Sequence, residues 1–193
     1  MSGRSISVRV PISPYRRAFG WLLLFAILTA ASSQGPAESA SADEYEIRAA
    51  MLMNLTKFID WPAWKLDASH PQFLICILGP DPIGPAADRY LLNTTAGGKP
   101  VQVKHLTSAD GAESCHILYV DISERKMLDR ITPELAKNGV LVASERSNSV
   151  SPNQVIGLPA VDEHVHIDIN LTAAERSGLT ISSKLLRLAT VSH

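Results

Sequence analysis

The first long segment with a regular apolar pattern is EYEIRAAMLMNLTKFIDWP, residues 44–62. Apolar side chains recur there at intervals of three and four residues, which predicts an α-helix that is capped by Asp43 and ended by Pro62. The apolar positions cover more than one stripe of this helix. We therefore expect it to pack against a core and to offer a second apolar surface.

Short apolar runs alternate with helical patterns along the rest of the chain. The runs predict strands at residues 72–79, 99–106, 116–122, 140–144, 154–159 and 164–169. A polar turn between the last two suggests an antiparallel pair. Helices are predicted at residues 85–92, at 123–139 with Ser123 as cap and Gly139 as stop, and at 179–189.

This alternation of strands and helices predicts an α/β fold in one domain. We expect a layered sandwich, in which a mixed, mainly parallel sheet has flanking helices. Ligand sites in such sheets lie at the carboxyl ends of the strands, and the turn at Asp81 would occupy that edge.

The first 42 residues have the three parts of a secretory signal peptide followed by a linker. The apolar run at residues 18–30 is too short to span a bilayer, and small residues follow it. We expect cleavage after Ala31 or Ala42, export to the periplasm and a mature domain at residues 43–193; an uncleaved anchor is the alternative. YRRAFGW partly matches a twin-arginine signal, but ordinary secretion is favoured. The positive region before the apolar run contains Arg4, Arg9, Arg16 and Arg17.

The net charge of the mature domain argues against one class of partner, nucleic acid. The whole chain has a net charge of −1, and removal of residues 1–42 takes away four basic residues and one acid, which leaves −4. A mildly acidic domain is a poor candidate for binding nucleic acid. No later apolar run is long enough to enter a membrane after signal cleavage.

Two cysteines, Cys76 and Cys115, remain in the mature domain. An even number in an exported protein favours a disulfide, which for a loop of this size contributes about 4 kcal/mol in the chain-entropy treatment. Two free thiols buried in neighbouring strands are the alternative.

Candidate chemical sites are few, and a structural interpretation is favoured for each. Gly97, Gly98 and Lys99 lack the strand-loop-helix context of a phosphate loop and indicate a turn. His164, His166 and Asp168 would share one face of a strand and could bind zinc, but the apolar residues between them are typical of a half-buried strand. We expect no metal there.

The remaining polar candidates do not form a catalytic set by their spacing. They are Ser123, Ser144, His105 and His116. Without a nucleophile, a base and an orienting group, we expect a protein that is not an enzyme and that has no cofactor.

Two segments together resemble the YfiR-like family of periplasmic regulators. They are EYEIRAAMLMNLTKFIDWP near the start and INLTAAERSGLTISSKLLRLATV at the end. FLICILGPDPIG and CHILYVDISE lie between them in the family order, so that the similarity covers residues 44–191. The chain resembles the free-standing form of the family.

The resemblance implies a protein that acts by binding. Family members repress an inner-membrane diguanylate cyclase through its periplasmic sensor domain, and so control cyclic-di-GMP. An outer-membrane lipoprotein can sequester the repressor, and related domains are fused to histidine kinases. Cys76 and Cys115 match the family's disulfide. Two departures are Met53, where relatives often have tyrosine, and the absence of a second cysteine pair near Gln154, which puts redox sensing by a second bridge in doubt.

The terminal segment, SGLTISSKLLRLATVSH, could be a membrane anchor, a core helix or a partner-binding surface. Two cations without an aromatic residue argue against a membrane anchor. If residues 179–189 are helical, Ile181, Leu185, Leu188 and Ala189 form one apolar stripe. If this helix lies side by side with the first helix, the two would form a shared contact surface for a second copy or for the regulated enzyme. That predicted surface contains Met53, Leu55, Trp61, Lys184 and Arg187, and we expect a homodimer. The rival hypothesis is a small-molecule sensor that acts with a histidine kinase or cyclase.

Overall fold

A computed structural model describes residues 36–80, 83–91, 93–120, 125–146, 154–162 and 164–193. The chain divides into two units, Met1–Pro36 and Ala37–His193, and the second contains the central sheet with its flanking helices. The predicted arginine-rich region, the apolar run at 18–30 and the cleavage position after Ala31 lie outside the described residues. Among the helices that these residues form, none is long and apolar enough to cross a membrane.

The first described helix, α2 (Pro36–Leu55), differs from its predicted bounds at both ends. It begins inside the segment predicted as a linker, so Asp43 is within the helix and is not its cap. It ends seven residues before Pro62, where amide groups of Thr56 and Phe58 bond to carbonyls three residues earlier. The chain then forms β1 (Ile59–Asp60) and the 3-10 turn η2 (Ala63–Leu66). Pairing of β1 with a distant strand explains the early end of the helix.

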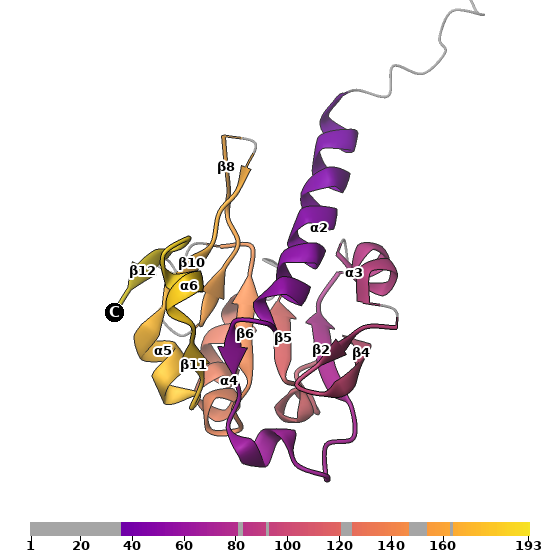
Figure 1. Cartoon of the computed structure of the whole chain (residues 1–193). Coiled ribbons are helices and arrows are strands. Elements are labelled where there is room, and N and C mark those ends of the chain that lie inside the picture. Colours follow the sequence, from indigo (N-terminus) through magenta and orange to yellow (C-terminus); the bar gives the residue numbers. More distant parts are fainter. Residues whose placement is uncertain (1–35, 81–82, 92, 121–124, 147–153, 163) are drawn as a thin grey trace, which may run out of the picture. The chain divides into compact units, whose positions relative to one another are not determined.

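The central sheet has eight strands within the described residues and is mainly parallel, as predicted. Neighbouring pairs from β4 through β2, β5, β6 and β7 are parallel, whereas β3 pairs with β4 and β7 with β10 in antiparallel register. Figure 1 shows the sheet with helices around it. In spatial order the strands are β12 (Thr190–Ser192), β10 (Asp168–Asn170), β7 (Ile156–Gly157), β6 (Leu141–Ser144), β5 (Ile117–Val120), β2 (Phe73–Leu78), β4 (Lys99–Leu106) and β3 (Thr95–Ala96).

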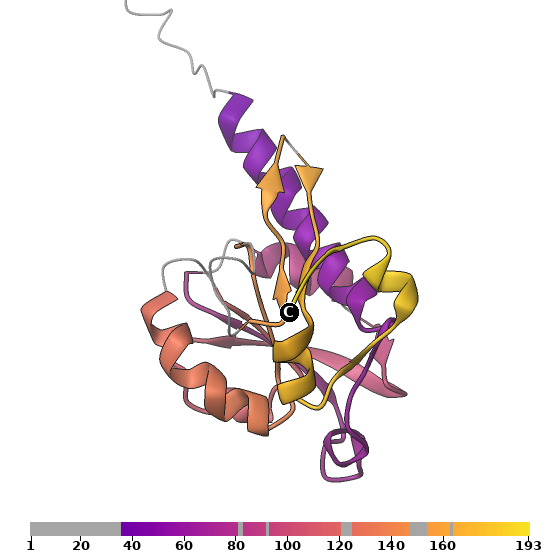
Figure 2. The same cartoon turned by 90° about the vertical axis from the view of Figure 1, so that its left-hand side faces the viewer.

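Alternating side chains of the central strands enter two separate cores. On β5, Ile117 and Tyr119 enter the larger core, whereas Leu118 and Val120 enter the smaller one. Residues of α2, of α3 (Gly84–Leu91) and of α5 (Leu171–Arg176) complete the larger core, and α4 (Arg125–Lys137) covers the smaller one. Figure 2 shows α2 and α4 on different sides of the sheet. The predicted helices at 85–92 and 123–139 are thus confirmed, although Ser123 lies outside the described residues.

The C-terminal segment differs most from its prediction. A helix, α5, forms at residues 171–176, where none was predicted, and Asn170 caps it through a hydrogen bond from the amide of Ala173. The predicted helix at 179–189 is wrong: β11 (Thr180–Ile181), one turn of helix α6 (Ser183–Leu186) and then β12 replace it. Pairing of β11 with β1 and of β12 with β10 outweighs the local helical pattern.

Two hairpins account for the turn-rich segments. Gly97 and Gly98, both at positive φ, connect β3 to β4, which confirms the turn interpretation of this glycine pair. A second hairpin joins β8 (Ala160–Val161) to β9 (His164–Val165) and was not predicted as a separate element. The predicted antiparallel pairing of residues 154–159 with 164–169 is confirmed by the β7–β10 pair.

Candidate functional site

The disulfide joins two neighbouring strands of the sheet. Cys76 lies on β2 and Cys115 directly precedes β5, and their Cα atoms are 6.0 Å apart in the bonded pair. Both side chains are fully buried in the smaller core, beneath Leu135 of α4. The predicted bridge is therefore confirmed, and the alternative of two free thiols is wrong.

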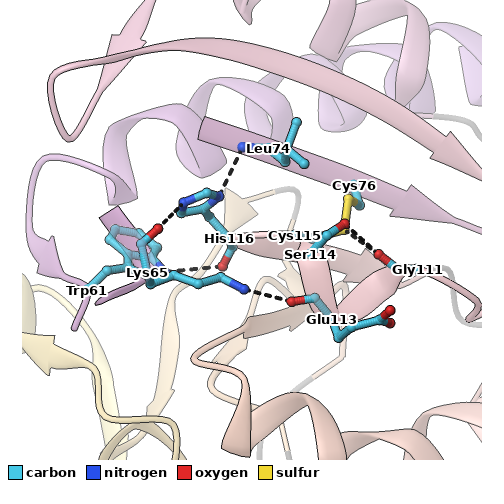
Figure 3. The surroundings of a disulfide bond; sticks show 9 residues. All are labelled: Trp61, Lys65, Leu74, Cys76, Gly111, Glu113, Ser114, Cys115 and His116. Atoms are coloured by element: carbon cyan, nitrogen blue, oxygen red, sulfur yellow. Dashed lines mark hydrogen bonds between the residues drawn. A yellow bond between two sulfur atoms is a disulfide. The ribbon is translucent and has the colours of Figure 1, made fainter. Parts of the chain in front are cut away.

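A buried histidine lies next to the bridge, on the opposite face of the sheet (Figure 3). The Nδ1 atom of His116 accepts a hydrogen bond from the amide of Leu74 at 3.1 Å, so its Nε2–H donates to the carbonyl of Lys65 at 3.0 Å. The ring stacks on Phe73 with centroids 4.4 Å apart. Burial lowers the pKa of His116 to about 4, and this imidazole therefore stays neutral near pH 7.

Lys65 and Trp61 complete this cluster and tie the η2 turn to the start of β5. The Nζ atom of Lys65 donates to the carbonyl of Glu113 at 2.7 Å, and the indole N–H of Trp61 donates to the carbonyl of His116 at 3.2 Å. Burial lowers the pKa of Lys65 to about 8, while the charge of Glu113 acts in the opposite direction. Each polar group here bonds to the backbone, which indicates a structural role.

A Ser-His-Asp cluster on the surface resembles a catalytic triad in composition but not in geometry. Ser69 and Asp67 both contact the same ring nitrogen, Nδ1, of His70, each at 3.1 Å. A triad needs the serine and the carboxylate on opposite ring nitrogens. Hydrogen bonds from Ser69, and then from His70, lower the pKa of Asp67 to about 2. The cluster is therefore best described as an exposed turn.

The other predicted chemical candidates are dispersed. His164 and His166 are exposed, whereas Asp168 is buried on a separate strand. Among the described residues no group of three His, Cys, Asp or Glu side chains could hold a metal ion. Ser144 is buried and its hydroxyl donates to Gln154 at 2.6 Å. The predicted ligand turn at Asp81 lies outside the described residues.

A buried arginine anchors α2 to the strands of the sheet. Arg48 is 4% exposed, and its Nε atom donates to the carbonyl of Leu158 at 3.1 Å. Its guanidinium lies 3.2 Å from the carboxylate of Glu44 and 3.8 Å from that of Glu145. The cation is thus paired and hydrogen-bonded, as a buried charge must be. These contacts fix the orientation of α2, which the hydrophobic pattern alone did not predict.

A groove lies between α2 and α3 and has exposed apolar side chains. Its volume is about 370 Å³, and it is lined by Ile47, Ala50 and Tyr90 together with Glu46. Ile47 is 42% and Tyr90 is 45% exposed, and Arg89 pairs with Glu46 beside them. Met53, one helical turn beyond Ala50, is partly buried, and its sulfur lies 3.7 Å from the hydroxyl of Thr94, which donates to the carbonyl of Leu91 at 2.7 Å. This is the apolar surface of α2 that the first helix was expected to offer.

The five residues predicted to bind a partner do not share one surface. Leu55 and Trp61 are 2% and 7% exposed and belong to the larger core. Lys184 and Arg187 are exposed on and just after α6, next to Leu188, which is 77% exposed. In Figure 1, α3 and α6 lie on opposite sides of α2. Met53 therefore belongs with the α2–α3 groove, and the two cations belong with a different surface.

Sequence reasoning missed several residues that shape these surfaces. Tyr90 was inside a weak helical pattern, and Arg48 looked like an ordinary exposed helix charge. Lys65 follows an exposed Trp64 in a segment without periodicity. A signal was available for Ile47, which belongs to the surplus apolar stripe of the first helix.

A family model described as YfiR/HmsC-like matches residues 45–190. The matched range runs from the second half of α2 to the first residue of β12, and so includes the disulfide, the buried His116 cluster and the α2–α3 groove.

Proposed function

The chain belongs to the YfiR/HmsC-like family, and from that membership we propose that it is a periplasmic regulator of cyclic-di-GMP signalling. In this proposal it binds and represses the periplasmic sensor domain of an inner-membrane diguanylate cyclase, or of a histidine kinase. The family match over residues 45–190 is the observation that carries the proposal. The Cys76–Cys115 bridge supports an oxidising compartment such as the periplasm, because disulfides rarely persist in the cytosol.

We assign contact with the sensor domain to the α2–α3 groove. Exposed large apolar side chains that cluster around a depression are typical of interaction sites. Ile47 and Tyr90 form such a cluster, with Met53 next to it on α2. The Glu46–Arg89 ion pair at the rim supplies polar groups that can reorganise around a bound partner. An apolar side chain of the sensor domain would fill the groove.

The surface around α6 is assigned to a second copy of the chain. It presents Lys184, Arg187 and the exposed Leu188, on the other side of α2 from the groove. Separate surfaces would let a homodimer bind two sensor domains at once. An outer-membrane lipoprotein that competes for the α2–α3 groove would relieve repression.

The test uses inner membranes from cells that lack this chain but retain the cyclase. Purified protein is added, and conversion of GTP to cyclic-di-GMP is measured. We expect activity to fall in proportion to the protein added, and the cyclase or kinase to be identified by mass spectrometry after affinity capture. Unchanged activity, with no signalling enzyme in the captured fraction, would overturn the proposal.

A further inference from the structure

The chain between β1 and β2 forms a strap that passes the amino ends of β2 and β5. This strap, residues 61–70, contains η2 and lies against the residue that directly precedes β5 (Figure 3). Three of its apolar side chains rest on glycines of other segments, at positions where an added Cβ atom would lie only 3.0–3.2 Å away: Pro62 on Gly178, Trp64 on Gly139 and Leu66 on Gly97. The absence of side chains at these glycines lets the strap approach closely.

The polar contacts at the middle of the strap involve one ionisable side chain, His116. Its Nε2–H donates to the carbonyl of Lys65, and its own carbonyl accepts from the indole N–H of Trp61. The other ring nitrogen, Nδ1, accepts from the amide of Leu74 at 3.1 Å. A protonated imidazole carries a hydrogen on both nitrogens, so its Nδ1–H would face the N–H of Leu74. The geometry at the strap therefore requires the neutral form of His116.

The charged surroundings of His116 also oppose its protonation. The ionisable groups that face the ring or its neighbours are Lys65, His70 and Asp67 of the strap, Glu113 before β5 and Lys99 of β4. Burial lowers the pKa of His116 to about 4; the hydrogen bond to the strap carbonyl acts in the opposite direction, and the three basic groups of this set lower the pKa further. When the strap leaves, the ring regains water and its ordinary pKa of 6.5, so the released state binds more protons.

The strap is continuous with β1, and β1 holds the start of α6. Ile59 of β1 pairs with Ile181 of β11, and the amide of Ser182 donates to the carbonyl of Phe58 at 2.8 Å. The hydroxyl of Ser182 then caps α6 by accepting from the amide of Lys184. Release of the strap would therefore weaken the support of α6 on this side.

We propose that residues 61–70 form an acid-operated strap: protonation of His116 detaches them from the sheet and loosens the start of α6, while β2, β5 and the disulfide stay in place. In this step Nδ1 takes one proton from solvent, and the amide of Leu74 exchanges the ring nitrogen for water as its acceptor. The inference concerns the conformation of the chain itself and does not depend on the proposed function.

The size of the effect follows from the two pKa values of His116. With a pKa of about 4 in the attached state and 6.5 in the released state, the equilibrium constant for release should rise about twentyfold between pH 7 and pH 5. Lys65 has a pKa of about 8 and Asp67 a pKa of about 2, so both keep their charges over this range. The change should level off below pH 4, where His116 is protonated in both states.

Amide hydrogen exchange of the mature protein at pH 7 and pH 5 measures this release, after correction for the intrinsic effect of pH on exchange. The amides of Leu74 and Ser182 should each lose protection about twentyfold in acid. The amides of β6 should stay at least about tenfold more protected than these two at both pH values, because they open only with the whole sheet.

Two variants identify the group that titrates. His116→Gln can keep a donor and an acceptor, and its strap amides should have the same protection at both pH values. The matched His70→Gln removes the exposed histidine whose ring lies 5.9 Å from that of His116, and it should retain the twentyfold change. If His116→Gln unfolds, the parent protein and His70→Gln still decide. Protection of Leu74 that does not change with pH, protection equal to that of β6, or loss of the response in His70→Gln would overturn the proposal.

Discussion

The face of the sheet under α2 and α3 has a broad apolar core, whereas the face under α4 has a smaller core that contains the Cys76–Cys115 bridge. On the first face, helices α2, α3 and α5 all contribute buried side chains. On the second, the described side chains of α4, from residue 130 onward, contribute Leu135 and the partly buried Ile131. Among the side chains that the structure describes, the cluster of buried apolar residues is larger on the first face than on the second.

This difference suggests how stability and binding are divided in the molecule. A small core supplies less hydrophobic stabilisation, and a covalent bridge between β2 and β5 compensates by restricting the unfolded chain. The larger core holds α2 firmly enough that its outer side can expose Ile47 to solvent beside Tyr90 of α3. In this account the bridge stabilises the α4 face, the larger core stabilises the α2 face, and the exposed side of α2 is the surface proposed to bind the sensor domain.

Removal of the bridge should have the largest effect on stability. Replacing both Cys76 and Cys115 with alanine should lower the free energy of unfolding by about 4 kcal/mol, because the loop they close spans 39 positions. Chemical denaturation of the variant and the parent measures the loss. Hydrogen exchange should increase first in α4 and the start of β5, with α2 still protected. Equal loss of protection in α2 would contradict the division into two faces.

Truncation of one buried leucine on each face of the sheet should distinguish the two cores by their coupling to the bridge. Leu52→Ala, at a fully buried position on α2, should cost about 3 kcal/mol with or without the bridge. Leu135→Ala should instead couple to the bridge, because Leu135 belongs to the same small core. A double-mutant cycle with the cysteine variant gives both coupling energies. Similar coupling for the two leucines would show that the cores are not independent.

Acid should destabilise the protein through His116. Its pKa is about 4 in the folded chain and 6.5 when unfolded, so the unfolded state binds more protons between these values. Stability should therefore decrease as the pH falls through this window, by about 2 kcal/mol between pH 7 and pH 5. His116→Gln, which can keep a donor and an acceptor without titrating, should flatten this part of the stability curve. An unchanged pH dependence in that variant would exclude His116 as the cause.

Two substitutions distinguish the buried side of the C-terminal segment from its exposed side. Leu185 is 3% exposed, so Leu185→Ala should cost about 2 kcal/mol or more, whereas Arg187→Glu should leave the unfolding temperature unchanged. The charge reversal should weaken self-association in analytical ultracentrifugation. A dimer that persists unchanged would place the interface elsewhere.

The sequence predicted the strands of the sheet more accurately than the surfaces. Apolar runs such as Phe73–Leu78 are buried on both sides, and burial of that kind is encoded locally. The segment after Gly178 looked helical because its apolar spacing fits a helix, but long-range pairing of Thr180–Ile181 with Ile59–Asp60 determines its conformation. Spacing on one helix also cannot show which apolar side is covered, and so Leu55 was placed on the surface although it is buried.

The central claim is that the α2–α3 groove contacts the sensor domain. Measuring repression by variants of this groove tests it most directly. Ile47→Arg and Tyr90→Ala change exposed side chains, and Val161→Arg is a matched control on the β8–β9 hairpin with 48% exposure. All three should unfold at the parent temperature. Cellular cyclic-di-GMP should rise with the two groove variants to the level of cells that lack this chain, and should stay at the parent level with Val161→Arg. Normal repression by a folded Ile47→Arg protein would contradict the account.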